Sequence, residues 1–191
     1  MGIPASSGEW KRPLFLQEKR GLTAVEYGTL MHSVMQHIDP RGDVSQRGIE
    51  AQVREMVERE ILLPEHQKIL RMKTIRAFFT SSVGKRLRKA KEVWRELPFS
   101  RMLPAGDFYE GAEPGEEIFI QGIIDLLFEE EDRSLVLVDY KTDGDTSPER
   151  VKEEYRIQIS LYSRAVESIL QRKVKEKYLY MLHDGTVVEM E

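Results

Sequence analysis

The sequence predicts an α/β fold in which helices flank a mixed central sheet, with a helical region on its N-terminal side. Three observations lead to this fold class. Apolar residues recur with a helical period through residues 23–90. Strand-like apolar runs follow, and a long helical pattern over residues 149–171 separates them from a final pair of strands. Helices that alternate with strands in this way pack as layers on a sheet.

Each element is placed by its own pattern. The polar residues 1–20 are expected to form an arm or linker, and residues 21–191 are expected to form one domain. The dipeptide Asp184-Gly185 separates the last two strands and is typical of a type I′ hairpin turn. The expected helices cover residues 23–37, 45–59, 64–79, 84–90 and 149–171, and the expected strands cover 92–100, 116–128, 135–141, 177–183 and 186–189.

The composition excludes several classes of protein. The chain has 191 residues, of which 40% are hydrophobic, and this is enough for one sizeable core. No run approaches the roughly 18 apolar residues of a membrane span, and no secretory signal is visible, so no membrane partner and a cytoplasmic location are expected. Cysteine is absent, which excludes a disulfide and an iron–sulfur cluster held by thiolates. Neither an H-E-x-x-H zinc motif nor a phosphate-binding P-loop occurs.

Two strand-like runs each carry one aspartate in an apolar setting. Asp125 lies in Gly122-Ile-Ile-Asp-Leu-Leu-Phe128, and Asp139 lies in Leu137-Val-Asp-Tyr-Lys-Thr-Asp143. Side chains alternate across a strand, so Lys141 points to the same face as Asp139. An ionised carboxylate in an apolar strand is costly unless it is paired or bound to a metal. The two aspartates therefore predict a divalent-metal site that activates water, and the alternative is a buried Asp–Lys ion pair that supports the sheet.

The turn between these runs sets the register of the two aspartates. If the loop is residues 131–133, Glu130 pairs with Ser134 and Asp125 lies directly opposite Asp139, with Cβ atoms about 4.5–5.5 Å apart. A change of two residues in the loop would make the aspartates diagonal neighbours about 7–8 Å apart. One hard cation with oxygen ligands at about 2.0–2.6 Å could be shared in either register.

Two helical segments carry further polar candidates. Gln158 and Tyr162 are four residues apart and share a helix face, where Gln158 lies among apolar neighbours. Upstream, Gly28-Thr-Leu-Met-His32 opens an apolar-periodic helix. A histidine on such a face, taken alone, is more often a hydrogen-bonded core residue than a metal ligand.

Together these motifs identify a family resemblance. The order G-x-I-D-L, V-D-Y-K-T and Q-x-x-x-Y, preceded by the helix that carries His32, resembles the RecB-type branch of the PD-(D/E)xK nuclease superfamily. Within that branch it is most similar to the C-terminal nuclease domain of AddA-type helicase–nuclease subunits. The resemblance runs from about Gly21 to the C-terminus and implies a restriction-endonuclease-like core.

The resemblance implies a set of site residues. Lys141 matches the catalytic lysine that positions or helps deprotonate the attacking water, and Gln158 and Tyr162 match the helical motif near the DNA. Glu96 matches a family glutamate near the site, with a less defined role. The ion implied is Mg²⁺ or Mn²⁺, and Ca²⁺ could occupy the same ligands. The matched metal ligands are His32, Asp125, Asp139 and the main-chain carbonyl of Tyr140.

Charge is unevenly distributed along the chain. The net charge is −4, yet residues 68–95 contain ten Lys and Arg with one acidic residue, and residues 107–132 contain ten Asp and Glu with no cation. Phosphate contacts dominate non-specific DNA affinity, so we expect DNA to approach along the basic stretch. The alternative is a solvated helix face or a face that docks on an acidic domain. The candidate DNA contacts are Lys85, Arg86, Arg88, Lys89 and Lys91.

The resemblance also implies a biological setting. We expect a metal-dependent DNA nuclease, an exonuclease when coupled to a helicase, that acts on double-strand breaks in the bacterial cytoplasm. The implied partners are single-stranded DNA, helicase domains of the same parent chain and an AddB-like subunit. Two alternatives stay open. One is a stand-alone phage or CRISPR-associated exonuclease, and the other is a catalytically inactive nuclease fold that serves as a DNA-binding or structural module.

Overall fold

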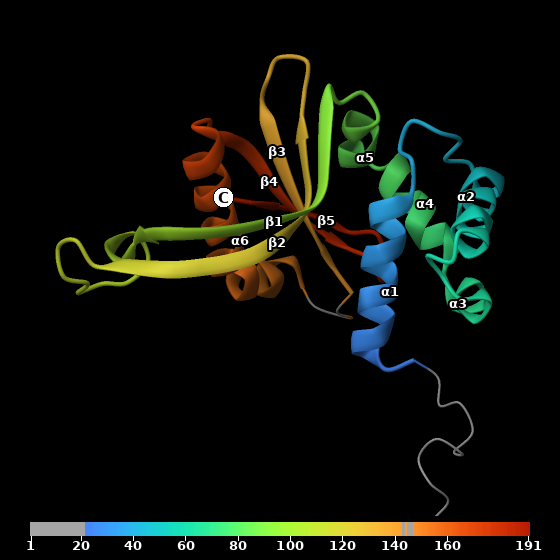
Figure 1. Ribbon diagram of the computed structural model, residues 1–191, viewed down its shortest axis with the longest axis horizontal. Coiled ribbons are helices and arrows are strands. Elements are labelled where there is room, and N and C mark those ends of the chain that lie inside the picture. The colour runs from blue at the N-terminus through green and yellow to red at the C-terminus, as the bar shows by residue number, and fades with distance from the viewer. Residues whose placement is uncertain (1–21, 143, 145–146) are drawn as a thin grey trace, which may run out of the picture.

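The computed structural model describes residues 22–142, 144 and 147–191, so the expected arm or linker over residues 1–20 lies outside it. Helices of the N-terminal region pack together on one side of a sheet (Figure 1). Side-chain caps begin several of them: Thr23 and Glu26 form a capping box on the first helix. The helices of this region are α1 (Ala24–His37), α2 (Gln46–Glu58), α3 (Pro64–Ile69), α4 (Met72–Thr80) and α5 (Ser82–Leu87).

The prediction of one helix over residues 64–79 is wrong. The helix is interrupted at Leu70 and Arg71, whose ψ angles are 133° and 84°. The side chain of Leu70 is buried in the core that α1, α2 and α4 share, so the break allows an apolar side chain to turn inward. The helix predicted at residues 84–90 begins earlier, because Ser81 caps it by accepting a hydrogen bond from the amide of Gly84.

The sheet has five strands in the order β1-β2-β3-β4-β5. All neighbours are antiparallel except β3 and β4, which are parallel and are connected by the long helix α6 (Pro148–Leu170). The predicted mixed sheet flanked by helices is thereby confirmed. The strands are β1 (Glu92–Pro104), β2 (Glu117–Glu129), β3 (Leu135–Lys141), β4 (Val174–Met181) and β5 (Val187–Met190).

Two hydrophobic cores fill the faces of the sheet. One lies between the sheet and the N-terminal helices, and the other lies between the sheet and α6 (Figure 1). Strand β3 is buried along almost its whole length because both of its faces are covered. In the part of the chain that the structure describes, no helix is long and apolar enough to span a membrane.

Strands β1 and β2 continue past the rest of the sheet as a two-stranded ribbon, residues 98–104 with residues 117–123 (Figure 1). A short 3₁₀ turn, Ala105–Asp107, follows β1 near the ribbon's tip. Strand β1 continues to Pro104, beyond the predicted end at residue 100, and β2 lies within one residue of its predicted bounds. One face of the ribbon exposes Met102 and Phe119. The pairing of β2 with β3 ends where the ribbon leaves the sheet, and this is where the motif residues lie.

The final hairpin is present, but its turn differs from the prediction. Gly185 has a φ of +86°, whereas Asp184 has no positive φ, and a type I′ turn needs both. The amides of Met181 and Gly185 instead bond to the carbonyls of Thr186 and Met181, which closes a longer loop.

Candidate metal centre

Asp125 and Asp139 stand at the point where β2 and β3 separate. Of the two registers left open by the sequence, the structure has the one with a loop of residues 131–133: the amide of Glu130 bonds to the carbonyl of Ser134, and the ladder runs to the last pair, Leu126 with Val138. At the next position the backbone pairing has ended. Instead, Oδ2 of the Asp125 side chain accepts a hydrogen bond of 2.6 Å from the backbone amide of Tyr140. Asp125 and Asp139 are 8% and 3% exposed, so both carboxylates are buried in an apolar setting as the sequence indicates.

Helix α1 brings His32 to Asp125. The Nδ1 atom of His32 lies 3.1 Å from Oδ1 of Asp125 and 4.0 Å from Oε1 of Glu96. One ligand atom from each of these three residues lies within 4.8 Å of the others, which is close enough to share one ion. Helix α1 also passes close to the end of β3 at Gly28, where a Cβ would stand 3.1 Å from the hydroxyl oxygen of Thr142.

Glu96 occupies an irregular point of β1. Its φ is +48°, an uncommon value for a residue other than glycine, and the pairing of β1 with β2 skips it. Glu96 and Arg95 both reach towards α1, although side chains in a regular strand alternate: Arg95 donates to the carbonyl of Ile38 at 2.8 Å. The local backbone strain therefore turns a carboxylate towards His32 that a regular strand would direct to the other face.

Lys141 and Asp139 form the second half of the centre. Nζ of Lys141 lies 2.9 Å from Oδ2 of Asp139 and donates to Oε1 of Gln158 at 2.9 Å. The amide nitrogen of Gln158 lies 3.4 Å from Oδ1 of Asp139, so Gln158 on α6 bridges the lysine and the aspartate. The structure thus contains the Asp–Lys pair of the alternative interpretation, and it places that pair beside the His32 cluster.

Tyr162 has a different setting from Gln158. Its ring packs edge-to-face on Phe99 at 5.2 Å between ring centroids, and it lies against Gly122, where a Cβ would stand 3.2 Å from its Cε1. Tyr162 therefore supports the base of the ribbon next to the centre. Its expected place near the DNA stays a prediction.

Burial and like charge shape the electrostatics of the centre. Desolvation and the charge of Asp125 raise the pKa of Asp139 to about 6, although Lys141 opposes this. Burial and Asp125 likewise raise the pKa of Glu96. Burial lowers the pKa of His32, but the hydrogen bond and charge of Asp125 outweigh this effect and leave the pKa raised. Carboxylates that resist ionisation in this way would be stabilised by a bound cation.

The basic stretch lies away from this centre. Arg86 donates to Glu130 at 2.8 Å and to Glu176, and Arg88 donates to the carbonyl of Pro40. Glu130 directly follows β2 and is five residues beyond Asp125, or about 16 Å along an extended chain. Two of the five candidate DNA contacts thus hold α5 to the sheet and the loop after α1, while Lys85, Lys89 and Lys91 are exposed.

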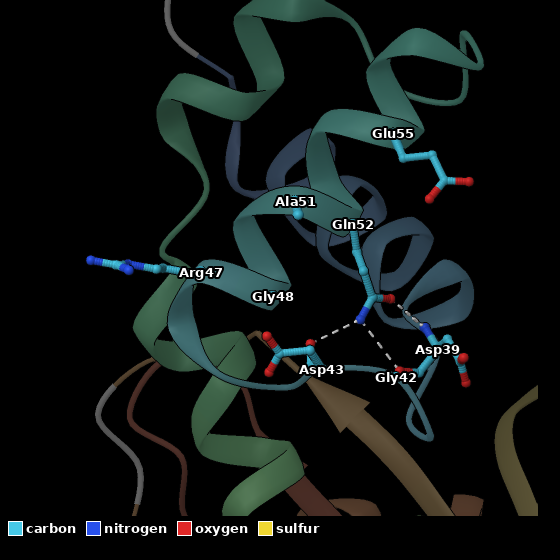
Figure 2. Close-up of a pocket in the computed structure, with 8 residues that line it drawn as sticks. All are labelled: Asp39, Gly42, Asp43, Arg47, Gly48, Ala51, Gln52 and Glu55. Atoms are coloured by element: carbon cyan, nitrogen blue, oxygen red, sulfur yellow. Dashed lines mark hydrogen bonds between the residues drawn. The ribbon is translucent and has the colours of Figure 1, made fainter.

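A separate hollow of about 390 Å³ opens beside the start of α2 (Figure 2). Gln52 bonds there to the amide of Asp39 at 2.7 Å and to the carbonyl of Asp43 at 3.2 Å. Figure 2 shows that these bonds hold the loop that precedes α2. None of the motif residues lines this hollow, so it is a structural feature of the loop rather than part of the candidate centre.

Tyr155 is a residue of the centre that the sequence motifs did not single out. Nζ of Lys141 lies over its ring, 4.2 Å from the ring centroid. Its position could have indicated this, because Tyr155 lies three residues before Gln158 and shares its helix face.

The chain belongs to the PD-(D/E)XK nuclease superfamily, because the model of that family matches residues 10–190. Nucleases of this superfamily use divalent metals. The family assignment made from the motifs is confirmed.

Among characterised proteins the chain is similar to the A subunits of ATP-dependent helicase/nucleases from several bacteria. It is 46% identical over 184 residues to the protein of Thermoanaerobacter sp. (strain X514), a match that covers 94% of this chain and 15% of the relative. For Acetivibrio thermocellus the identity is 42%, with 93% and 14% covered. For Moorella thermoacetica it is 45%, with 95% and 13% covered. The chain therefore spans about a seventh of the length of these relatives.

Proposed function

We propose that this chain is a DNA nuclease that depends on Mg²⁺ or Mn²⁺. The observation that carries the proposal is the juxtaposition of two clusters. His32, Glu96 and Asp125 offer ligand atoms within 4.8 Å of one another, and Asp139, Lys141 and Gln158 form a bonded group beside them. A cation site next to a partly buried lysine is the arrangement that hydrolysis of a phosphodiester needs.

The donor atoms suit a hard divalent ion. His32, Glu96 and Asp125 offer ligand atoms close enough to share it. Asp139 and the main-chain carbonyl of Tyr140 would complete the set. Oδ2 of Asp139 is buried and has no hydrogen bond of good geometry among the described residues, although it lies beside Lys141. A buried carboxylate oxygen of this kind has a lone pair for a cation. One imidazole among oxygen ligands makes Mn²⁺ as suitable as Mg²⁺, and Ca²⁺ could occupy the same atoms.

The bound ion would polarise a phosphoryl oxygen and lower the pKa of a ligated water. The chain's own residues have the remaining tasks. Lys141 holds its ammonium beside Asp139, where it can donate a hydrogen bond to the attacking water or to a phosphate oxygen. Gln158 keeps that ammonium and Asp139 in a fixed relation. Tyr162 supports the wall of the centre next to the ribbon.

The relatives suggest the larger setting. Residues 21–191 would form the nuclease domain of a longer helicase–nuclease subunit of the AddA type, whose similar relatives are named for both activities. Helicase domains of the parent chain would feed a single DNA strand to the centre at high effective concentration. An AddB-like subunit would complete the assembly, and exonuclease action at double-strand breaks would be its role.

The test is a cleavage assay with end-labelled single- and double-stranded DNA and Mg²⁺, Mn²⁺ or EDTA. We expect cleavage with either ion, none with EDTA, and none by the Asp125→Asn and Asp139→Asn variants. Val25→Ala, at an exposed position of α1 outside the centre, is the matched control. Tight DNA binding without cleavage under every condition would favour an inactive nuclease fold instead.

A further inference from the structure

The ammonium of Lys141 is held by three groups. Oδ2 of Asp139 and Oε1 of Gln158 each lie 2.9 Å from Nζ, and the ring of Tyr155 lies with its centroid 4.2 Å from the same atom. The Lys141 side chain is only 15% exposed, so little water reaches this ammonium. The contacts with Asp139 and Gln158 link Lys141 to the other residues of the centre. The contact with the ring of Tyr155 needs a separate explanation.

Tyr155 is fixed in place by its own packing. It lies three residues before Gln158 on α6, so the two side chains share one face of the helix. It is partly buried and packs on the core between α6 and the sheet. Helix α6 thus supplies two of the three contacts to Lys141, and it does so from a rigid element rather than from a loop.

We propose that Tyr155 is a positioning residue that keeps the Lys141 ammonium beside Asp139 through the face of its ring. This inference rests on the proposed nuclease function. A cation over an aromatic ring is attracted by the negative face of the ring, and the interaction strengthens as water is excluded. A ring also blocks the space into which a long lysine side chain would otherwise move. The two effects confine Nζ without adding a further negative charge to a centre that already holds several carboxylates.

An aromatic contact serves this position better than another carboxylate would. Burial and the charge of Asp125 already raise the pKa of Glu96. A fourth acid, at position 155, would compete for the metal and would leave Lys141 bound too tightly to meet the substrate. The ring holds the ammonium from one side and leaves its hydrogen-bond donors to the oxygen partners.

The kinetic test compares Tyr155→Leu with Tyr155→Phe. Tyr155→Leu should lower kcat about tenfold, which is the size of a partly desolvated cation–π contact, and leave KM for DNA and the Kd for Mn²⁺ unchanged. Tyr155→Phe keeps the ring and should restore most of kcat. Tyr109→Leu, at an exposed position near the tip of the ribbon, is the matched control for loss of a tyrosine. A wild-type kcat in Tyr155→Leu, or an equal loss in Tyr155→Phe, would overturn the proposal.

Fluorinated phenylalanines at position 155 test the ring face without a change of shape. Each added fluorine withdraws electron density from the ring, so log kcat should fall steadily with the number of fluorine atoms. A flat series would show that the ring acts by shape alone and would overturn the electrostatic role. This series also serves if Tyr155→Leu does not fold.

A spectroscopic measurement separates this inference from the proposed function. A ring above Nζ should shift the Lys141 Hε resonances upfield, and Lys141→Ala identifies those resonances by their loss. The upfield shift should disappear in Tyr155→Leu and persist in Tyr155→Phe. A wild-type chain that shows the shift but cleaves no DNA with Mn²⁺ contradicts the nuclease function and with it the positioning role. A chain that cleaves DNA without the shift contradicts the Tyr155 contact alone.

Discussion

The carboxylate of Asp125 accepts a hydrogen bond of 2.6 Å from the main-chain amide of Tyr140, where the ladder between β2 and β3 has ended. One oxygen of Asp125 thus ties it to the strand that carries Asp139, while the other lies 3.1 Å from His32. Asp125 consequently has a structural and a chemical role at once, and the two can be separated by substitution.

Asp125→Ala should destabilise the metal-free protein by about 1–3 kcal/mol, because it leaves the buried amide of Tyr140 without an acceptor. Asp125→Asn retains an oxygen that can accept this bond and should cost less. Both variants should lose Mn²⁺ affinity, because both lose a charged ligand. Urea unfolding without metal and calorimetric titration with Mn²⁺ check the two effects separately. Wild-type Mn²⁺ affinity in Asp125→Asn would show that the ion lies elsewhere.

Asp139 should make the metal-free protein less stable as the pH rises. Its pKa is about 6 in the folded chain, mainly through burial and the charge of Asp125, and about 3.9 for an unfolded aspartate. The protonated form therefore favours folding, and its contribution is complete below pH 4 and lost as the pH rises through about 6. Asp139→Asn cannot ionise, so its melting temperature relative to wild type should increase between pH 4 and pH 7.

Mn²⁺ provides the control for this effect. The ion should raise the melting temperature of the wild-type protein more at pH 7 than at pH 5, since protons compete for the same carboxylate. The melting temperature of Asp139→Asn should respond little to the ion at either pH. A constant difference in melting temperature between Asp139→Asn and wild type across this range would mean that Asp139 ionises normally.

Lys141→Ala should reduce the rate of cleavage and retain the metal, because an ammonium is not a ligand for a cation. Removal of the lysine also takes away the charge that lowers the pKa of Asp139, so that pKa should rise further. Mn²⁺ affinity should accordingly be measured at about pH 8, where Asp139 is ionised in both proteins. We expect kcat to fall by about 100-fold or more, as for loss of a hydrogen-bond donor that stabilises charge in the transition state. Cleavage at the wild-type rate would contradict the proposed role.

The strand half of the centre could be predicted from the sequence because short-range rules determine it. Strand alternation placed Lys141 on the face of Asp139, and the loop length placed Asp125 opposite it. Both aspartates stood out because a carboxylate is costly in an apolar run. These inferences need only residues that are close along the chain.

The remaining contacts depend on packing between distant segments. The left-handed backbone of Glu96 turns its carboxylate towards His32. The sequence around Glu96 contains no glycine or turn motif that would predict this backbone conformation. Tyr155 resembles any other aromatic residue on an amphipathic helix until α6 is laid across the sheet. The helix break at Leu70 likewise depends on tertiary packing, because it places the Leu70 side chain in the core between the helices.

Arg86 and its basic neighbours should have separable effects on stability and on DNA binding. Arg86 is 28% exposed and pairs with Glu130 and Glu176, so Arg86→Ala leaves two partly buried carboxylates without their cation. We expect a loss of stability of about 1–3 kcal/mol by urea unfolding. Lys85 and Lys89 are exposed, and their joint replacement by Ala should leave stability unchanged.

The same two lysines test the path of the DNA. If single-stranded DNA follows α5, the Lys85→Ala, Lys89→Ala double variant should bind it more weakly, and each lost phosphate contact should flatten the slope of log affinity against log salt by about 0.7. Arg47 and Arg54 are exposed on a different helix, α2, and their joint replacement by Ala is the charge-matched control. Equal salt slopes in the two double variants would place the DNA path away from α5. Arg86 pairs with Glu130, which follows β2 and lies about 16 Å along the chain from Asp125. That result would therefore leave α5 with the structural role that its ion pairs indicate.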